Sequence, residues 1–170
     1  MKKTTVLALI AGVALASTAS ASGFTGDYAP ANWTFQTNQN GFVAQHDAST
    51  LVLVGPDNGS FAFGFSDIFV VVPQSGSISF DWSYTSNDDP GFDAGFYIAN
   101  SFFFLSDTDG QSGSVSGVTV NVGDLFGFSV ETIDSLFGPG VLTITNFSYV
   151  PAPGSLAILG LAGLAARRRR

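Results

Sequence analysis

Most of the chain between residues 32 and 150 alternates apolar positions with small or polar ones, in short runs. The clearest run, residues 76–86, reads GSISFDWSYTS, in which large apolar side chains from Ile78 to Tyr84 alternate with serine and aspartate. A period of two places successive side chains on opposite faces of a β-strand. This run therefore predicts a strand with one buried face and one exposed face.

Similar runs follow one another along the chain, separated by Gly, Asn, Asp and Pro. Such punctuation is typical of turns between short strands. The pattern predicts strands within residues 32–35, 41–45, 50–54, 59–65, 67–72, 76–86, 94–99, 101–106, 112–122, 125–131 and 140–150. In the run 59–65 we expect Phe61, Phe63 and Phe65 on one face, and in the last run we expect Leu142, Ile144 and Phe147 to face inward.

No part of this region has a sustained helical period, and residues 134–138 suggest one short helical turn at most. Parallel α/β folds need crossover helices, so they are disfavoured. The prediction is an all-β, antiparallel β-sandwich of jelly-roll type. Cysteine is absent and phenylalanine occurs 17 times, so burial rather than disulfide bonding must stabilise the domain, which we place at residues 22–149.

Charge is strictly segregated along the chain. All 13 acidic residues lie between Asp27 and Asp134, whereas the six basic residues are Lys2, Lys3 and Arg167 to Arg170. Nucleic acids and anionic lipid headgroups both require a basic surface. The domain is therefore expected to bind neither, and to touch a membrane only through the C-terminal segment.

The N-terminus has the features of a secretory signal peptide. Lys2 and Lys3 precede an apolar run at residues 6–16, and Ala19-Ser20-Ala21 fits the small-residue motif that signal peptidase recognises. We predict a signal peptide at residues 1–21, cleaved after Ala21. The alternative, a membrane anchor, is disfavoured because the apolar run is too short to span a bilayer.

The C-terminus combines a Pro-Ala-Pro motif, a short apolar segment at residues 156–166 that predicts a hydrophobic helix, and four arginines. The segment is shorter than an ordinary transmembrane helix. The arginines at its end argue against a buried core helix and favour a stop-transfer segment with a cytoplasmic basic end.

This arrangement resembles the PEP-CTERM sorting signal of Gram-negative bacteria. The resemblance covers residues 150–170: Pro151, Ala152 and Pro153, the apolar segment, and Arg167, Arg168, Arg169 and Arg170. Ala152 replaces the usual glutamate of the motif. The resemblance implies recognition by an exosortase, a membrane-embedded cysteine protease-transpeptidase, with cleavage near residues 151–153. It also implies transient inner-membrane anchoring, followed by delivery to the cell surface or the extracellular polysaccharide matrix.

Two acidic clusters are candidates for a calcium site. Asp88, Asp89 and Asp93 follow the predicted strand 76–86, and Asp107 and Asp109 precede a glycine. Calcium prefers several carboxylate and carbonyl oxygens from flexible loops. The alternative is ordinary turn chemistry, in which aspartate side chains accept local backbone hydrogen bonds. The lack of basic residues nearby favours a cation as the neutralising partner, so Ca²⁺ is the one cofactor that we consider.

Aromatic side chains on a jelly roll can bind sugars, and Trp33 and Tyr97 are the candidate glycan-binding residues. Trp82 and most phenylalanines are expected in the core instead. Catalysis is disfavoured because residues 22–149 contain no Cys or Lys and only one histidine, His46, which has no nucleophile motif around it.

The sequence thus predicts a non-catalytic, exported surface or matrix protein with a structural or adhesive role. The alternative is a carbohydrate-binding module for exopolysaccharide, with or without calcium, and a glycoside-active enzyme is a distant third. Aromatic residues exposed on a sheet face would favour the carbohydrate-binding module, whereas aromatic residues that are all buried would favour the structural role.

Overall fold

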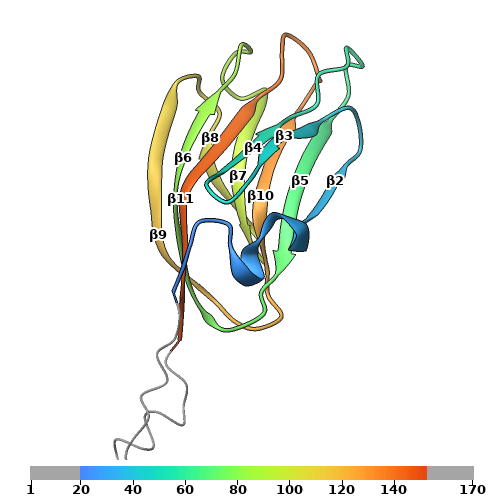
Figure 1. Ribbon diagram of the computed structural model, residues 1–170. Helices are drawn as coiled ribbons and strands as arrows, with labels where there is room; N and C mark the ends of the chain where they lie inside the picture. Colours follow the sequence, from blue (N-terminus) through green and yellow to red (C-terminus); the bar gives the residue numbers. More distant parts are fainter. Residues whose placement is uncertain (1–19, 153–170) are drawn as a thin grey trace, which may run out of the picture. The chain divides into compact units, whose positions relative to one another are not determined.

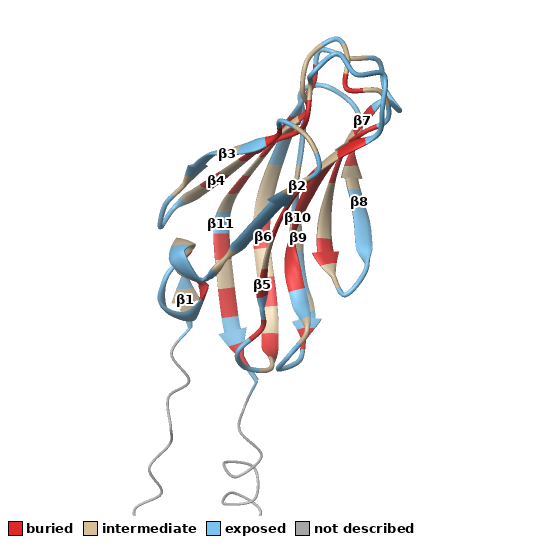
Figure 2. Cartoon of the chain, turned by 90° about the vertical axis from the view of Figure 1, so that its right-hand side faces the viewer, coloured by how far each residue is buried: buried red, intermediate tan, exposed pale blue. Residues whose placement is uncertain are grey.

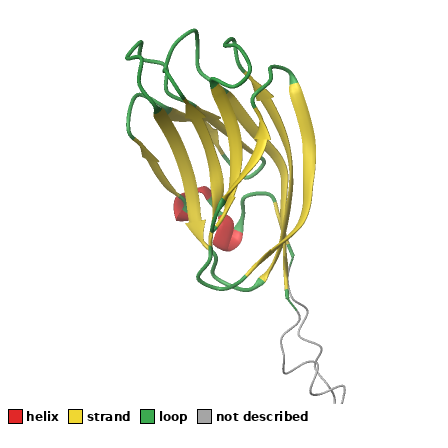
Figure 3. Ribbon diagram, turned by 180° about the vertical axis from the view of Figure 1, so that it is seen from behind, coloured by secondary structure: helices red, strands yellow, loops and turns green. Residues whose placement is uncertain are grey.

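The computed structural model describes residues 20–152, which form two antiparallel β-sheets packed face to face (Figure 1). The strands are β1 (Ala21–Ser22), β2 (Thr34–Thr37), β3 (Phe42–His46), β4 (Thr50–Val54), β5 (Gly64–Val71), β6 (Gly76–Thr85), β7 (Asp93–Ala99), β8 (Phe102–Ser106), β9 (Gln111–Val120), β10 (Leu125–Thr132) and β11 (Val141–Pro151). Two single 3₁₀ turns, η1 (Gly26–Tyr28) and η2 (Pro30–Asn32), are the helical elements of this region (Figure 3).

The strand order is that of a jelly roll. One sheet has the order β3-β4-β11-β6-β9, with β1 beside β11, and the other has the order β2-β5-β10-β7-β8. Four nested antiparallel pairs alternate between the sheets: β4 with β11 and β6 with β9 lie in the first, and β5 with β10 and β7 with β8 lie in the second. A long hairpin of four strand pairs, rolled so that successive pairs alternate between sheets, gives this order. The predicted jelly-roll sandwich is confirmed.

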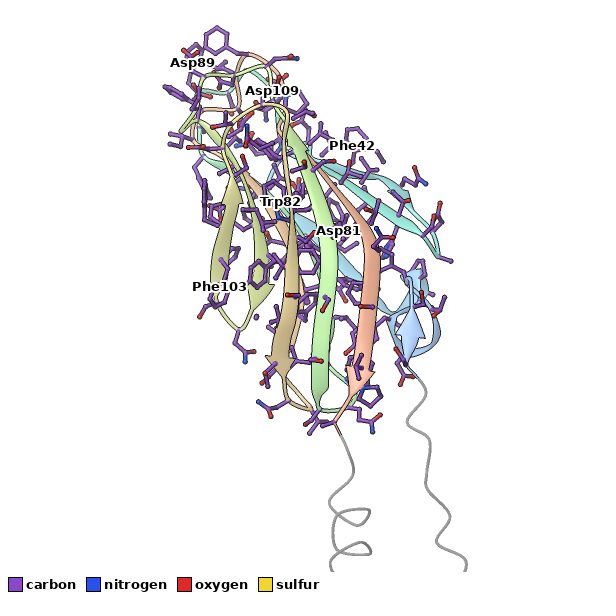
Figure 4. All side chains as sticks on the ribbon, turned by 90° about the vertical axis from the view of Figure 1, so that its left-hand side faces the viewer. Phe42, Asp81, Trp82, Asp89, Phe103 and Asp109 are labelled. Carbon is purple, nitrogen blue, oxygen red and sulfur yellow. The ribbon has the colours of Figure 1, made fainter. Side chains whose placement is uncertain are left out.

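The core lies between the sheets and is rich in aromatic side chains. In β6, Ile78, Phe80 and Tyr84 are buried as the alternation predicts, and Trp82 packs against the same core near its edge (Figure 4). Phe80 meets Phe128 of the facing sheet edge-to-face, with ring centroids 5.0 Å apart. Edge-to-face contacts of this kind stabilise a core beyond the area that they bury.

A β-bulge in β11 preserves the inward direction of its apolar residues. The pairing with β6 shifts between Thr145 and Ser148, and Asn146 has a φ of 50°. One extra residue reverses the alternation, so buried side chains at Leu142 and Ile144 are followed by buried Phe147. The inward positions predicted for all three residues are confirmed.

The prediction for residues 59–65 is wrong in its first half. Phe61 is 79% exposed and has a φ of 55°, and Phe63 is also exposed, so both belong to a loop that precedes β5. The Asn58 side chain accepts a hydrogen bond from the Ser60 backbone, which starts a turn there. Residues 134–138 form no helix either, since Ser135 and Phe137 both have positive φ.

Both ends of the described region belong to the sheet. Ala21 pairs with Tyr149, Pro151 at the end of β11 pairs with Gly76, and the Ala152 amide donates to the Ser75 carbonyl at 2.8 Å. Strand β11 therefore extends two residues beyond the predicted domain end at residue 149. Within residues 20–152, no helix has the length and apolar character needed to cross a membrane.

Several predictions concern residues outside the described region. These are the rest of the signal peptide, including Ala19, together with Pro153, the hydrophobic helix at residues 156–166 and the arginines at 167–170. Signal cleavage and sorting therefore stay predictions from the sequence.

Candidate functional site

The outer surfaces of the two sheets differ in chemistry. Along β6, β9 and β11 the outward side chains are mostly Ser and Thr around Asp81, which accepts hydrogen bonds from Ser114 and Asn146. The outer surface of the sheet β2-β5-β10-β7-β8 is rich in phenylalanine instead. We call this second surface the aromatic face. A large apolar surface on an otherwise acidic and polar domain marks a site of interaction.

Cross-strand register arranges the aromatic face in rows. Its residues alternate along each strand with buried ones such as Phe126, Phe128 and Ile68, so they point outward. One row consists of Gln36, Asp67, Ser129, Phe96 and Phe104. The next row consists of Thr34, Phe69, Gly127, Ile98 and Phe102. Phe65 and Glu131 extend the face at one end, and Val71 and Leu125 extend it at the other.

The phenylalanines on the β7–β8 side of the face are accessible. Phe102 is 51% exposed and Phe104 is 58% exposed, and strand β8 carries a long exposed stretch in Figure 2. The Phe96 ring lies edge-on to both, with centroid distances of 6.0 Å to Phe102 and 5.8 Å to Phe104. Together the three rings form an apolar cluster next to the polar row.

A buried carboxylate lies at the centre of the face. Asp67 is only 7% exposed, and its two oxygens accept hydrogen bonds from Ser129 Oγ at 2.6 Å and Gln36 Nε2 at 3.1 Å. These bonds fix the carboxylate and leave lone pairs for a further donor. Burial raises the pKa of the neighbouring Glu131, and the charge of Asp67 raises it further. The face thus combines apolar rings with a fixed acidic centre.

Two pockets open on either side of Phe69. The first, of about 230 Å³, is lined by Gln36, Asp67, Phe69, Ile98, Asn100, Phe102 and Leu125. The second, of about 370 Å³, is lined by Asp27, Asn32, Thr34, Phe69, Val70, Val71 and Pro73. Each pocket contains one aspartate, at least one side-chain amide and an apolar wall, and Phe69 belongs to both.

Glycine at position 127 permits the close approach of β10 to β5 at Phe69. A Cβ atom there would lie 2.7 Å from Phe69 Cβ and would also clash with the Ile68 carbonyl oxygen. Gly in a strand interior often marks such a close approach. The small residue thus lets Phe69 lie close to β10 between the two pockets.

The two predicted glycan-binding residues lie elsewhere. The Trp33 ring packs among Phe24, Phe128 and Phe147, and its Nε1 donates to the Tyr28 carbonyl at 2.9 Å. Tyr97 faces the core on β7, where its ring stacks on Phe103 with centroids 4.8 Å apart. Neither side chain belongs to the aromatic face, whose outward residues on β7 include the adjacent Phe96.

The sequence does contain a signal for the aromatic face. Residues 67–72, 94–99 and 101–106 are apolar at nearly every position rather than at every second one. In a two-layer sandwich only one face of each strand meets the core, so a strand that is apolar on both faces must expose an apolar surface. The single Asp67 within the first of these runs marks the polar centre.

Three of the five predicted calcium residues, Asp88, Asp93 and Asp109, lie around Ser86 at one end of the sandwich. Asp93, 1% exposed, accepts a hydrogen bond from Ser86 Oγ at 3.0 Å, and Asp109 accepts one from the Ser86 amide at 3.1 Å. Asp93 Oδ1, Asp88 Oδ2 and Tyr84 Oη are buried with no hydrogen-bond partner among the described residues. Burial raises the pKa of Asp93, which outweighs the lowering by the Thr132 and Ser86 hydroxyls.

The other two aspartates make only local contacts. Asp89 donates its amide to the Asp88 carboxylate at 2.7 Å, and Asp107 accepts from the Thr108 hydroxyl at 3.0 Å. Figure 4 shows Asp89 and Asp109 in loops at the same end of the sandwich. Across residues 20–152, no three Asp, Glu, His or Cys side chains already converge on one point as a metal site. Asp88 and Asp93 are thus the candidate ligands, and calcium stays a prediction.

His46 lies in an apolar environment. Its ring meets Phe24 and Trp33 edge-to-face, and burial lowers its pKa. Among the hydrogen bonds of residues 20–152, none joins a serine hydroxyl to this ring. The geometry of a Ser-His-Asp triad is therefore absent from the described residues.

No family model and no curated protein matches the chain. Several solved structures are similar to it. The family 11 carbohydrate-binding module of cellulase Lic26A-Cel5E from Clostridium thermocellum is 9% identical, with a TM-score of 0.38, over 71% of this chain and 88% of that one. A carbohydrate-binding module of the β-sandwich superfamily, studied for its promiscuous specificity, is 12% identical, with a TM-score of 0.48, over 77% of this chain and 61% of that one.

A third similar structure is TmCBM61 in complex with β-1,4-galactotriose. It is 14% identical, with a TM-score of 0.42, over 76% of this chain and 94% of that one. A shared function does not follow at such identities and TM-scores, and the jelly-roll assignment rests on the strand order of this chain itself.

Proposed function

We propose that the protein is a non-catalytic carbohydrate-binding domain whose aromatic face holds an extended polysaccharide. The observation that carries this proposal is the combination of exposed Phe102 and Phe104, the fixed polar row around Asp67, and the two pockets that meet at Phe69. Sugar rings have apolar C–H faces and polar edges, so they suit apolar walls with a few fixed polar groups.

The predicted targeting segments agree with such a role. An exported protein with an exosortase-type sorting signal would work at the cell surface or in the extracellular polysaccharide matrix, where its ligand is abundant. Because Pro151 pairs with Gly76, cleavage near residues 151–153 requires the end of β11 to separate from β6 first. Signal peptidase and exosortase are thus proposed processing partners.

A structural role is the second candidate, and the edge strand β8 favours it. Residues 102–104 are three consecutive exposed phenylalanines on a strand at the end of its sheet order. An uncharged, apolar edge strand can pair with another chain. In that case the aromatic face would bind a second copy rather than a sugar chain, and the protein would assemble without polysaccharide.

Matched variants distinguish the two roles. Phe102 on the aromatic face is 51% exposed and Phe42 on the other sheet is 52% exposed, so Phe102→Ala and Phe42→Ala remove equal apolar surface. Affinity electrophoresis in gels that contain neutral polysaccharides should show retardation of the wild type and of Phe42→Ala. We expect Phe102→Ala to lose most of it, since burying a phenylalanine side chain against a ligand contributes up to about 1.5–3 kcal/mol.

Analytical ultracentrifugation of the same proteins tests the structural role by measuring whether they form oligomers. If the wild type forms oligomers, Phe102→Ala is monomeric and no polysaccharide retards either protein, the structural role replaces carbohydrate binding.

A further inference from the structure

We infer that the ligand of the aromatic face is a hexosamine polymer with free amino groups, whose consecutive sugar units occupy the two pockets beside Phe69. This inference rests on the proposed carbohydrate-binding function and specifies its ligand. It depends on the pocket geometry, on the position of the carboxylates and on the charge of the whole domain.

The geometry indicates two adjacent subsites. Both pockets include Phe69, and each has its own aspartate, Asp67 in one and Asp27 in the other. Side-chain amides accompany both carboxylates: Gln36 and Asn100 in the first pocket, and Asn32 in the second. A polymer that crosses Phe69 would therefore meet a similar set of groups twice, which suits a ligand with a repeating unit.

The polar groups of the two pockets favour a sugar that donates hydrogen bonds over a sugar that carries an acidic group. Asp67 already accepts two hydrogen bonds and is held rigidly, and Glu131 lies close enough for the two charges to interact. An ionised carboxylate is a hydrogen-bond acceptor only, so it prefers a cationic or neutral donor. Aromatic rings next to it, such as Phe65 and Phe69, also attract an ammonium group through their electron-rich faces.

The negative charge of the whole domain argues against an acidic polymer as the ligand. All 13 acidic residues of the chain lie within residues 20–152, and none of its six basic residues does. The field around the domain therefore repels uronic-acid, sulfated and phosphorylated polymers and attracts polyamines. Neutral sugars feel neither effect, and a free amine gains from both the local carboxylates and the overall field.

The test compares a β-linked glucosamine hexamer with its fully N-acetylated counterpart by isothermal titration calorimetry, on the whole protein, at a pH that protonates the amine. The inference predicts at least tenfold tighter binding of the free amine. Asp67→Asn and Asp27→Asn should each reduce this preference about three- to tenfold. Asp57→Asn changes the net charge equally, but Asp57 lines neither pocket, so it should leave the preference intact.

Three outcomes would overturn the inference. If the wild type binds the two hexamers equally and Phe69→Ala binds neither, the carbohydrate-binding function stands and the preference for a free amine is refuted. Equal weakening by all three Asp→Asn variants, or equal binding of polylysine, would show non-specific attraction between opposite charges. No binding of either hexamer or of neutral polysaccharides would refute both proposals. Since Asp67 is nearly buried, the melting temperature of Asp67→Asn is measured alongside, and Asp27→Asn provides an independent readout.

Discussion

The buried carboxylate of Asp93 provides a test of the loops around Ser86. Its side chain is 1% exposed, Oδ1 has no hydrogen-bond partner among the described residues, and no Lys or Arg lies within residues 20–152. A buried polar group without a partner costs about 1–3 kcal/mol, and a charged group costs more. Without a bound cation, Asp93→Asn should therefore raise the free energy of unfolding by about 1–3 kcal/mol at pH 8.

The pH dependence of the stability follows from the direction in which the pKa of Asp93 is shifted. Burial raises the pKa of Asp93 in the folded protein, so the folded state takes up a proton before the unfolded state does. Stability should accordingly rise as the pH falls through this raised pKa, and it stops rising below the unfolded pKa of about 4. Asp93→Asn should remove this part of the pH dependence, so its advantage disappears in acid.

Calcium should reverse the effect of the substitution if Asp88 and Asp93 bind the ion. A hundredfold excess of Ca²⁺ over its Kd would add about 2.7 kcal/mol to the wild type, a shift of roughly 10 °C in Tm for a domain of this size. Thermal unfolding is measured at pH 5 and pH 8 in EDTA, CaCl₂ and MgCl₂ at equal ionic strength. Ionic screening alone would give equal gains in every salt.

Two results would refute this reasoning. If Asp93→Asn is less stable than the wild type in EDTA at pH 8, the carboxylate is stabilised by a partner that the geometry does not contain. If Ca²⁺ and Mg²⁺ shift the wild type equally, the loop around Ser86 is an ordinary acidic turn and the calcium prediction is wrong.

Three further predictions concern the face, the core and the C-terminus. Gly127→Ala should lower the free energy of unfolding in urea by about 1–3 kcal/mol and weaken polysaccharide binding, because the added methyl group clashes with the Ile68 carbonyl. Phe128→Ala should cost about 3–5 kcal/mol in the same assay, whereas Phe61→Ala, in an exposed loop, should stay within about 0.5 kcal/mol of the wild type. Replacing residues 167–170 with serine should release the precursor from the membrane fraction, and unchanged retention would contradict a stop-transfer role.

Local alternation was sufficient to predict most of the fold. Strand β6 follows its predicted pattern throughout, because a period of two needs only the sequence of one strand. Residues 59–65 show the same period, yet only Gly64 and Phe65 enter strand β5. Alternation is a local property, whereas pairing needs a partner strand, and β2 has only four residues to offer β5. On its other side β10 ends at Thr132, opposite Gly64, so the predicted extension towards Phe61 has no strand to pair with.

The site was harder to predict because the pairing register of a strand decides which of its side chains point outward. Phe96 and Tyr97 are adjacent and both aromatic, and Tyr97 was the candidate glycan-binding residue predicted from the sequence. Pairing with Phe128 turns Tyr97 inward, and pairing with Ser129 turns Phe96 outward. Residue type alone cannot decide between them, since a shift of one residue exchanges the faces. The pockets beside Phe69 likewise combine residues that are far apart along the chain.

The central claim is that the aromatic face binds polysaccharide, and backbone amide chemical shifts on titration with a glucosamine oligomer test it most directly. We predict that the largest changes lie in β5, β7, β8 and β10, above all around Phe69 and Ser129, while β6, β9 and β11 change little. Changes concentrated on the Ser- and Thr-rich surface around Asp81, or spread evenly over both sheets, would contradict the proposed site.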